Sequence, residues 1–333
     1  MKKIFVFLIL IFCVLIYCTF SSMALQEEIP KMTIKLGTFA TPTDYVGSGV
    51  SYFIDRVEEK TNGQITFDFL HSNTLGPEQG AFEMLSDNTI QMFVFGFVTN
   101  EKFLGFYAPF LIKNFDHVDR VMKSEIGDQW RQELLEESNV YMLGVLPRPP
   151  RQLTTTNTPV HSIKDIQGMK FRVPNIEILF ETWKAFGANP VAMDFMQVYT
   201  SMQQGIIEGQ DNPLQVTISY SLYEVQNYQM VWDYINMPVF VNANADFWNE
   251  LPQKAKDIIV ESYEEAKAKL VEDAITEQEK TLEKIEEKGL TIIHLKPEAI
   301  AEFREVANEF NKEYLSELWG SEVLERVIEI GNE

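Results

Sequence analysis

The pattern that most constrains the fold is an alternation of strand-like and helix-like segments, which occurs twice along the chain. In the first hundred residues, strand-like segments at 32–36, 65–70 and 90–95 alternate with helical patterns at 48–60 and 77–87. Such alternation is typical of an α/β fold with a sheet rich in parallel strands.

The alternation restarts near residue 140. Strands are predicted over 140–146, 152–156 and 170–173, and helices over 176–186 and 197–204. At roughly 100–200 residues per domain, a chain of 333 residues corresponds to about two domains. Since the chain contains no Pro-, Gly- or Ser-rich linker, we expect two α/β units that interleave through crossover strands.

A long helical pattern distinguishes the carboxyl-terminal third. Apolar residues recur at helical spacing from Pro252 to Lys288, and Gly289 provides a stop. A helix of about 37 residues would be about 55 Å long, which exceeds one small domain, so we expect it to brace both units. A strand over 290–295 and a helix over 297–314 complete the chain.

Residues 1–24 have the three-part pattern of a secretory signal peptide. Two lysines precede an apolar run over 4–17, and the small residues Ser22 and Ala24 suit a cleavage site. The alternative, an uncleaved membrane anchor, would need about 20 apolar residues. We therefore predict an exported protein, periplasmic or extracytoplasmic, that spans no membrane once the peptide is cleaved.

Charge and residue types remove several classes of function. The formal charge is −21, and no basic run follows the first lysines, which argues against nucleic acid as a partner. Cleavage would remove both cysteines, Cys13 and Cys18, and with them disulfides and thiol chemistry. The four histidines show no metal-ligand spacing, and neither a nucleophile elbow nor a phosphate-binding loop is present. These absences remove the common enzyme classes.

Two arginines in strand-like segments are candidate functional residues. Arg151 begins one alternating segment, and Arg172 lies among apolar residues in the next. An arginine is rarely buried without a partner. An internal salt bridge is one interpretation, and a bound anion is the other, because the guanidinium fork matches a carboxylate. The polar segment 208–213 follows a helix, and we predict a turn there.

Several segments, in order along the chain, resemble the solute-binding proteins of tripartite ATP-independent periplasmic (TRAP) transporters. The resemblance covers nearly the whole chain after the signal peptide. The segments that carry it are 57–63 (VEEKTNG), 166–174 (IQGMKFRVP), 186–190 (FGANP), 203–213 (QQGIIEGQDNP), 223–228 (YEVQNY) and 247–252 (FWNELP).

The resemblance implies a two-lobed, periplasmic-binding-protein-like (type II-like) α/β fold with crossover strands and a long lobe-spanning carboxyl-terminal helix. Lobe I would comprise residues 25–150 and about 238–275, and lobe II residues 151–237 and about 276–333. The lobes would close on a ligand by a hinge motion.

The resemblance also implies the function. Members of the family capture an organic acid and deliver it to membrane permease subunits driven by an ion gradient. We therefore expect a small-molecule carboxylate as ligand and no enzymatic activity, cofactor or metal. The alternatives are a sensor subunit that feeds a membrane signalling protein, and a secreted enzyme that acts on organic acids.

Individual residues match the family's ligand-binding positions. Arg172 matches the arginine that clamps the ligand carboxylate, Asn212 its partner, and Arg151 a second arginine used by many members. Phe195 stands where an aromatic residue often packs on the ligand, and Asn175 follows the Arg-Val-Pro motif.

Two departures bear on the ligand. Where the family often has glycine, two residues before Arg151, this chain has proline, so Arg148 is an alternative second clamp. Apolar residues occupy candidate pocket loops, and unless these rings face the core, Phe39 and Phe97 would form walls together with Phe195 and Trp183. These walls predict a monocarboxylate or dicarboxylate with an apolar or aromatic body.

Overall fold

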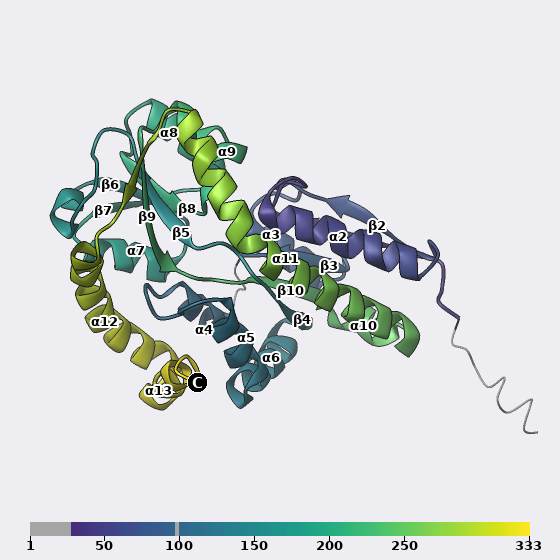
Figure 1. Cartoon of the computed structure of the whole chain (residues 1–333). Helices are drawn as coiled ribbons and strands as arrows, with labels where there is room; N and C mark the ends of the chain where they lie inside the picture. Colours follow the sequence, from purple (N-terminus) through teal and green to yellow (C-terminus); the bar gives the residue numbers. More distant parts are fainter. Residues whose placement is uncertain (1–27, 97–99) are drawn as a thin grey trace, which may run out of the picture.

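Two β-sheets, one in each half of the molecule, organise this computed structural model, which describes residues 28–96 and 100–333 (Figure 1). The predicted signal peptide, residues 1–24, lies outside the described residues. Within the described part of the chain, every helix is too short or too polar to span a membrane.

The first sheet has five strands in the order β2–β1–β3–β10–β4. Strands β1, β2 and β3 are parallel, whereas β10 runs antiparallel to both β3 and β4. The strands are β1 (Met32–Thr38), β2 (Ile65–Leu70), β3 (Met92–Phe95), β4 (Val140–Leu146) and β10 (Val239–Asn244). The helices of this half are α2 (Tyr45–Lys60), α3 (Glu78–Ser86), α4 (Glu101–Leu104), η1 (Gly105–Tyr107), α5 (Phe115–Lys123), α6 (Glu125–Ser138) and α10 (Ala245–Glu250).

The second sheet has six strands in the order β11–β9–β5–β8–β6–β7. Strand β5 runs antiparallel to its neighbours β8 and β9, and the remaining pairs are parallel. The strands are β5 (Arg151–Thr155), β6 (Lys170–Val173), β7 (Asn189–Ala192), β8 (Gly209–Asn212), β9 (Tyr228–Ile235) and β11 (Thr291–His294). The shorter helices of this half are η2 (Ile163–Ile166), α7 (Glu177–Ala185), η3 (Phe195–Gln197), α8 (Val198–Gln203), α9 (Leu214–Ser219) and η4 (Leu222–Glu224).

The chain passes between the sheets more than once. It crosses after β4, returns between β9 and β10, and crosses again along α11 (Gln253–Glu287), which runs diagonally across both halves in Figure 1. Early α11 residues such as Ile259 and Leu270 pack in the core of the first sheet, and Ile285 packs with Leu214 and Leu290 of the second. The predicted crossover strands and bracing helix are therefore confirmed.

One predicted element is wrong. The segment 208–213 is not a turn, because its residues 209–212 form β8, a buried central strand. Its polar side chains are tolerated there because each finds a partner: Gln210 donates to Thr154, and Asn212 donates to Gln210.

The carboxyl-terminal helices contact both halves. Helix α12 (Pro297–Trp319) begins against α7, and α13 (Ser321–Ile330) ends against α5. Trp319 donates from its indole nitrogen to the carbonyl of Lys102. Its ring lies over Gly105, and any other residue at that position would put its Cβ atom 1.9 Å from the ring. The predicted lobe boundaries stay a prediction, and these contacts place α13 beside α5, in the half that holds the first sheet.

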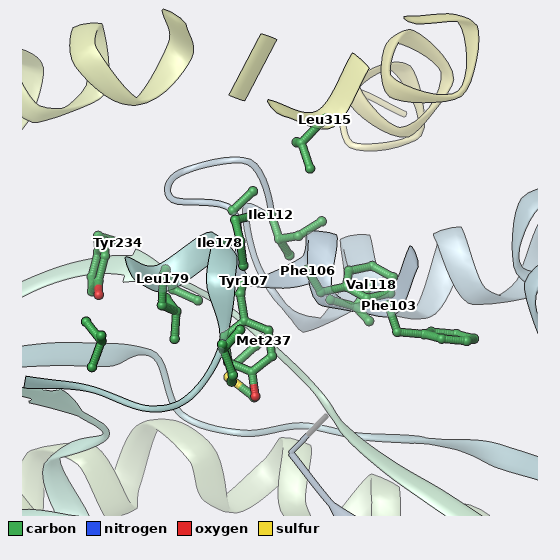
Figure 2. Close-up of a cluster of buried hydrophobic side chains, with 14 of the residues drawn as sticks. Phe103, Phe106, Tyr107, Ile112, Val118, Ile178, Leu179, Tyr234, Met237 and Leu315 are labelled. Carbon is green, nitrogen blue, oxygen red and sulfur yellow. The ribbon is translucent and has the colours of Figure 1, made fainter. Parts of the chain in front are cut away.

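A continuous hydrophobic cluster contains buried residues from both halves. Figure 2 shows that it is built from the segment after β3, from α7, from the end of β9 and from α12. Tyr107 and Met237 lie side by side within it, and Tyr107 donates from its hydroxyl to the carbonyl of Gly96. Tyr107 and Ile176 of this cluster also line the candidate site described below.

His117 of α5 forms a buried hydrogen bond to α13. Its Nε2 lies 2.8 Å from the carbonyl oxygen of Val327, so it is the donor, and its Nδ1 accepts from the backbone N–H of Lys113 at 3.3 Å. Burial, and after it the nearby Arg120 and Lys113, lower the pKa of the imidazole below its usual 6.5.

We expect acid to weaken this contact. Because the folded state disfavours the protonated ring, stability from His117 is complete above about pH 6.5 and is lost as pH falls through 6.5 towards the lower folded pKa. Urea unfolding between about pH 7.5 and 5 should show a steeper loss of unfolding free energy for the wild type than for His117→Gln. Equal slopes for the two proteins would contradict this role.

Candidate ligand-binding site

A cavity between the halves lies at the carboxyl ends of strands from both sheets. Its volume is about 130 Å³, against roughly 10–15 Å³ for one water, so it accommodates a small organic molecule. The first sheet contributes residues after β1, β2 and β4, and the second contributes the start of β5 and residues after β6, β7 and β8. This is where open α/β sheets bind ligands.

Arg172, on β6, is a buried cation without an ion-pair partner among the described residues. It is 3% exposed, and its Nε and Nη2 donate to the carbonyl oxygen of Met193 at 3.2 and 2.9 Å. The guanidinium lies 5.6 Å from the ring centre of Phe195. Burial, and then the charge of Arg151, lower the pKa of Arg172 to about 9. At neutral pH Arg172 remains a cation, and an anion bound in the cavity would pair with its buried charge.

Arg151 lines the same cavity but is already paired. It donates from Nε and Nη2 to both carboxylate oxygens of Asp211, which is fully buried on β8, and from Nη2 to the Asp211 carbonyl at 2.6 Å. Burial alone would lower the pKa of Arg151, but the Asp211 carboxylate reverses the direction and raises it. Tyr234 donates to the same carboxylate, and Trp183 donates to the Tyr234 hydroxyl at 3.2 Å.

Arg148, in the segment after β4, is the third arginine of the cavity. Its guanidinium lies 5.0 Å from the ring centre of Phe39. Burial, and then Arg151, lower the pKa of Arg148, whereas the carboxylates of Glu78 and Asp44 oppose that shift. Glu78 and Asp44 line the same cavity within the first half.

Two carboxamides lie at the junction of β8 and α9. Asn212 uses one N–H of its Nδ2 to donate to Gln210, at 2.6 Å, so a second N–H is left. Gln215, three residues later, lines the cavity with both amide atoms buried and without a hydrogen-bond partner in the described structure.

Aromatic rings form much of the wall. Phe39 and Tyr107 approach from the first half, and Phe195 and Tyr220 from the second. The rings of Phe195 and Tyr220 pack edge to face with centres 4.6 Å apart. Burial, and then the charge of Asp44, raise the pKa of the Tyr220 hydroxyl, which stays neutral.

The structure brings together five of the eight residues that the sequence singles out. Arg172, Arg151, Asn212, Phe195 and Phe39 all line the cavity.

Of the other three residues, the two that the structure describes are not among the lining residues. Trp183 is fully buried, stacks on Phe171 with centres 3.5 Å apart and is not among the lining residues. Asn175 donates to Asp194 outside the lining, and Phe97 lies outside the described residues.

The cavity is also lined by residues that the sequence did not single out: Asp44, Glu78, Tyr107, Gln215 and Tyr220. A signal for some of them exists in hindsight. Asp44 and Glu78 precede or begin the helix after a parallel strand, and Gln215 lies in the first turn of the helix after β8. Polar residues at the carboxyl ends of parallel strands are the ones that meet at a ligand site.

Known proteins are similar to this chain in sequence. A family model described as DctP, bacterial extracellular solute-binding protein, family 7, matches residues 36–317. A solute-binding protein of Roseobacter denitrificans is 29% identical over 282 residues, which cover 83% of this chain and 84% of that protein. The sialic acid-binding periplasmic protein SiaP of Vibrio cholerae is 29% identical over 303 residues, which cover 86% and 89%.

The fold is shared with solved structures. One is a TRAP periplasmic solute-binding protein of Roseobacter denitrificans with bound L-galactonate. It has a TM-score of 0.79 and 26% sequence identity, and the match covers 90% of this chain and 99% of that one.

Proposed function

The chain belongs to family 7 of the bacterial extracellular solute-binding proteins, and from this premise we propose that it captures an organic acid in the cavity between its lobes, with Arg172 as the carboxylate-binding group. Membership confirms the resemblance to TRAP solute-binding proteins. The family consists of binding proteins for transporters, so the prediction that the chain is not an enzyme is confirmed as well.

The observation that carries the proposal is the unpaired charge of Arg172. A guanidinium has five N–H donors, of which Arg172 uses two on the Met193 carbonyl. The remaining end of the fork can bind both oxygens of one carboxylate, a geometry that Arg favours over Lys. The free N–H of Asn212 would add a further hydrogen bond. Relatives named for sialic acid and for L-galactonate, both organic acids, support this ligand class.

The aromatic walls support the remaining part of the ligand. Phe39 and Phe195 lie on opposite lobes, so closure of the lobes would bring both rings onto an apolar or aromatic body. We propose that lobe I holds the first sheet and lobe II the second, with the hinge at the segments after β4 and β9 and within α11. The proposed binding site does not include three of the residues singled out from the sequence: Asn175, Phe97 and Trp183.

Delivery to a membrane permease completes the proposed role. The chain would be exported by residues 1–24 and would work in the periplasm or elsewhere outside the cytoplasm, where it presents its ligand to TRAP permease subunits. The extracellular description of the family supports this location.

A thermal-shift screen of residues 25–333 tests the function. The panel holds aliphatic, aromatic, keto, hydroxy, dicarboxylic and sugar acids. An acid present at about 1,000 times its dissociation constant should stabilise the protein by about 4 kcal/mol, which is a melting shift of several degrees. No shift with any acid, in protein that mass spectrometry shows to be free of retained ligand, would contradict the proposal.

A further inference from the structure

Two short segments carry the chain between the sheets, side by side. The first link, residues 147–150, joins β4 to β5, and the second link, residues 236–238, joins β9 to β10. The residues that flank the links are paired at both ends: Leu146 with Val239, and Arg151 with Ile235. A rotation of one sheet against the other therefore has to change the backbone angles of both links.

Prolines restrict these backbone angles. Three of the four residues of the first link are proline, and the fourth, Arg148, precedes a proline. In the second link, Met237 precedes Pro238. The proline ring fixes φ near about −65°, and a residue before proline is restricted to extended backbone. Among the link residues, only Asn236 has neither restriction.

The side chain of Asn236 is tied to the first half. Its Nδ2 donates to the carbonyl oxygens of Ile112 and Lys113 at 3.1 and 3.3 Å, in the segment between η1 and α5. The same segment is bound to the end of β9, because the backbone N–H of Phe110 donates to the carbonyl oxygen of Tyr234 at 2.6 Å. A rotation at Asn236 would stretch or break these hydrogen bonds.

Arg148 connects the two links to each other. Its Nη1 lies 3.9 Å from the sulfur of Met237, and its guanidinium lies 5.0 Å from the ring centre of Phe39, after β1. The side chain of the first link therefore contacts the second link and the first half at once. These contacts add to the restriction that the prolines impose.

We propose that the two links form a stiff hinge, which holds the lobes near the angle that they have in this structure, with rotation concentrated at Asn236. At this angle the cavity is enclosed, since Arg172 and Asn212 are only 3% and 7% exposed. A cavity held in its binding geometry loses less conformational freedom when a ligand binds. The inference goes beyond the proposed function, because it concerns the protein before any ligand binds.

Pulsed EPR between two spin labels tests the hinge. Residues 25–333 contain no cysteine, so Gln79→Cys on α3 and Thr200→Cys on α8 each take one label. Both side chains are exposed, and the two helices belong to different halves. The labelled protein is unfolded in denaturant, dialysed and refolded, so that no retained ligand holds the lobes together. We expect a single narrow distribution of label distances.

The double variant Pro149→Gly/Asn236→Ala should broaden this distribution towards longer distances. Loss of the proline alone should raise the population of the longer distances about two- to fivefold. The matched control is Pro297→Gly/Asn227→Ala, which should leave the distribution unchanged. It removes an exposed proline at the start of α12 and an amide that donates to the Thr156 carbonyl within the second half.

Milder variants keep the test decisive if circular dichroism shows that the double variant does not fold. Pro149→Ala and Asn236→Ala, each measured alone, should broaden the distribution in the same direction but less.

Two outcomes would overturn the stiff hinge. One is a wild-type distribution as broad as that of the double variant. The other is a set of folded variants with the wild-type distribution, which would mean that α11, and not the links, holds the angle. Because no ligand enters the measurement, its outcome is independent of the acid screen: a failed screen contradicts the receptor function and leaves the hinge standing.

Discussion

Arg172→Gln is expected to weaken acid binding strongly while the protein stays folded. Truncating one side of a buried charge pair costs about 2–5 kcal/mol of binding, so the dissociation constant should rise by roughly 30-fold to several thousandfold. Titration calorimetry of wild type and variant with the acid found in the screen measures this loss. Binding within tenfold of wild type would remove Arg172 from the site.

The stability of the ligand-free variant provides a second readout. Arg172 is 3% exposed, and its pKa is lowered because burial disfavours its charge. Without ligand, the charge therefore destabilises the folded state, so we expect Arg172→Gln to unfold at the same urea concentration as wild type or a higher one. Arg304→Gln is the matched control, because Arg304 is exposed and lies over the ring of Phe110, away from the cavity. It should leave binding unchanged.

The parts of the fold that follow local periodicity could be predicted from the sequence. Strand β1 alternates over its first residues, and α11 repeats its apolar residues at helical spacing, as expected because side chains alternate along a strand and repeat every 3.6 residues along a helix. Strand β8 could not be predicted in this way. Its residues are polar, and their burial depends on partners more than fifty residues away, such as Thr154 for Gln210 and Arg151 for Asp211.

The same limit applies to the site. The sequence left each arginine with two interpretations, a salt bridge or a bound anion. Tertiary structure separates the two: Arg151 pairs with a carboxylate on the neighbouring strand, whereas Arg172, on the other side of β8, hydrogen-bonds to the Met193 carbonyl and forms no ion pair with a described residue. The position of Gln215 just after a strand gives a signal in the sequence, but its unpaired amide does not, because pairing is a property of the surroundings and not of the residue.

Removing the carboxylate of Asp211 should destabilise the protein more than any surface change. Asp211→Leu leaves the guanidinium of Arg151 buried without its partner, and it also removes the acceptor of the Tyr234 hydroxyl. Breaking a buried ion pair from one side costs about 3–5 kcal/mol. Arg151→Met should cost a similar amount, because it leaves a fully buried carboxylate uncompensated. Urea unfolding measures both losses.

The double variant Arg151→Met/Asp211→Leu decides what Arg151 does. Replacing both members of a buried pair by apolar residues is often nearly neutral, so we expect the double variant to be more stable than either single variant, by at least about 2 kcal/mol. If Arg151 only stabilises the fold, the double variant should bind the acid with a dissociation constant within about tenfold of the wild-type value. The reason is that the position of Arg172 on β6 would be unchanged. A folded double variant that no longer binds would instead make Arg151 a ligand-binding residue, as the family resemblance implies. In that case the guanidinium of Arg151 would both stabilise lobe II and bind the ligand.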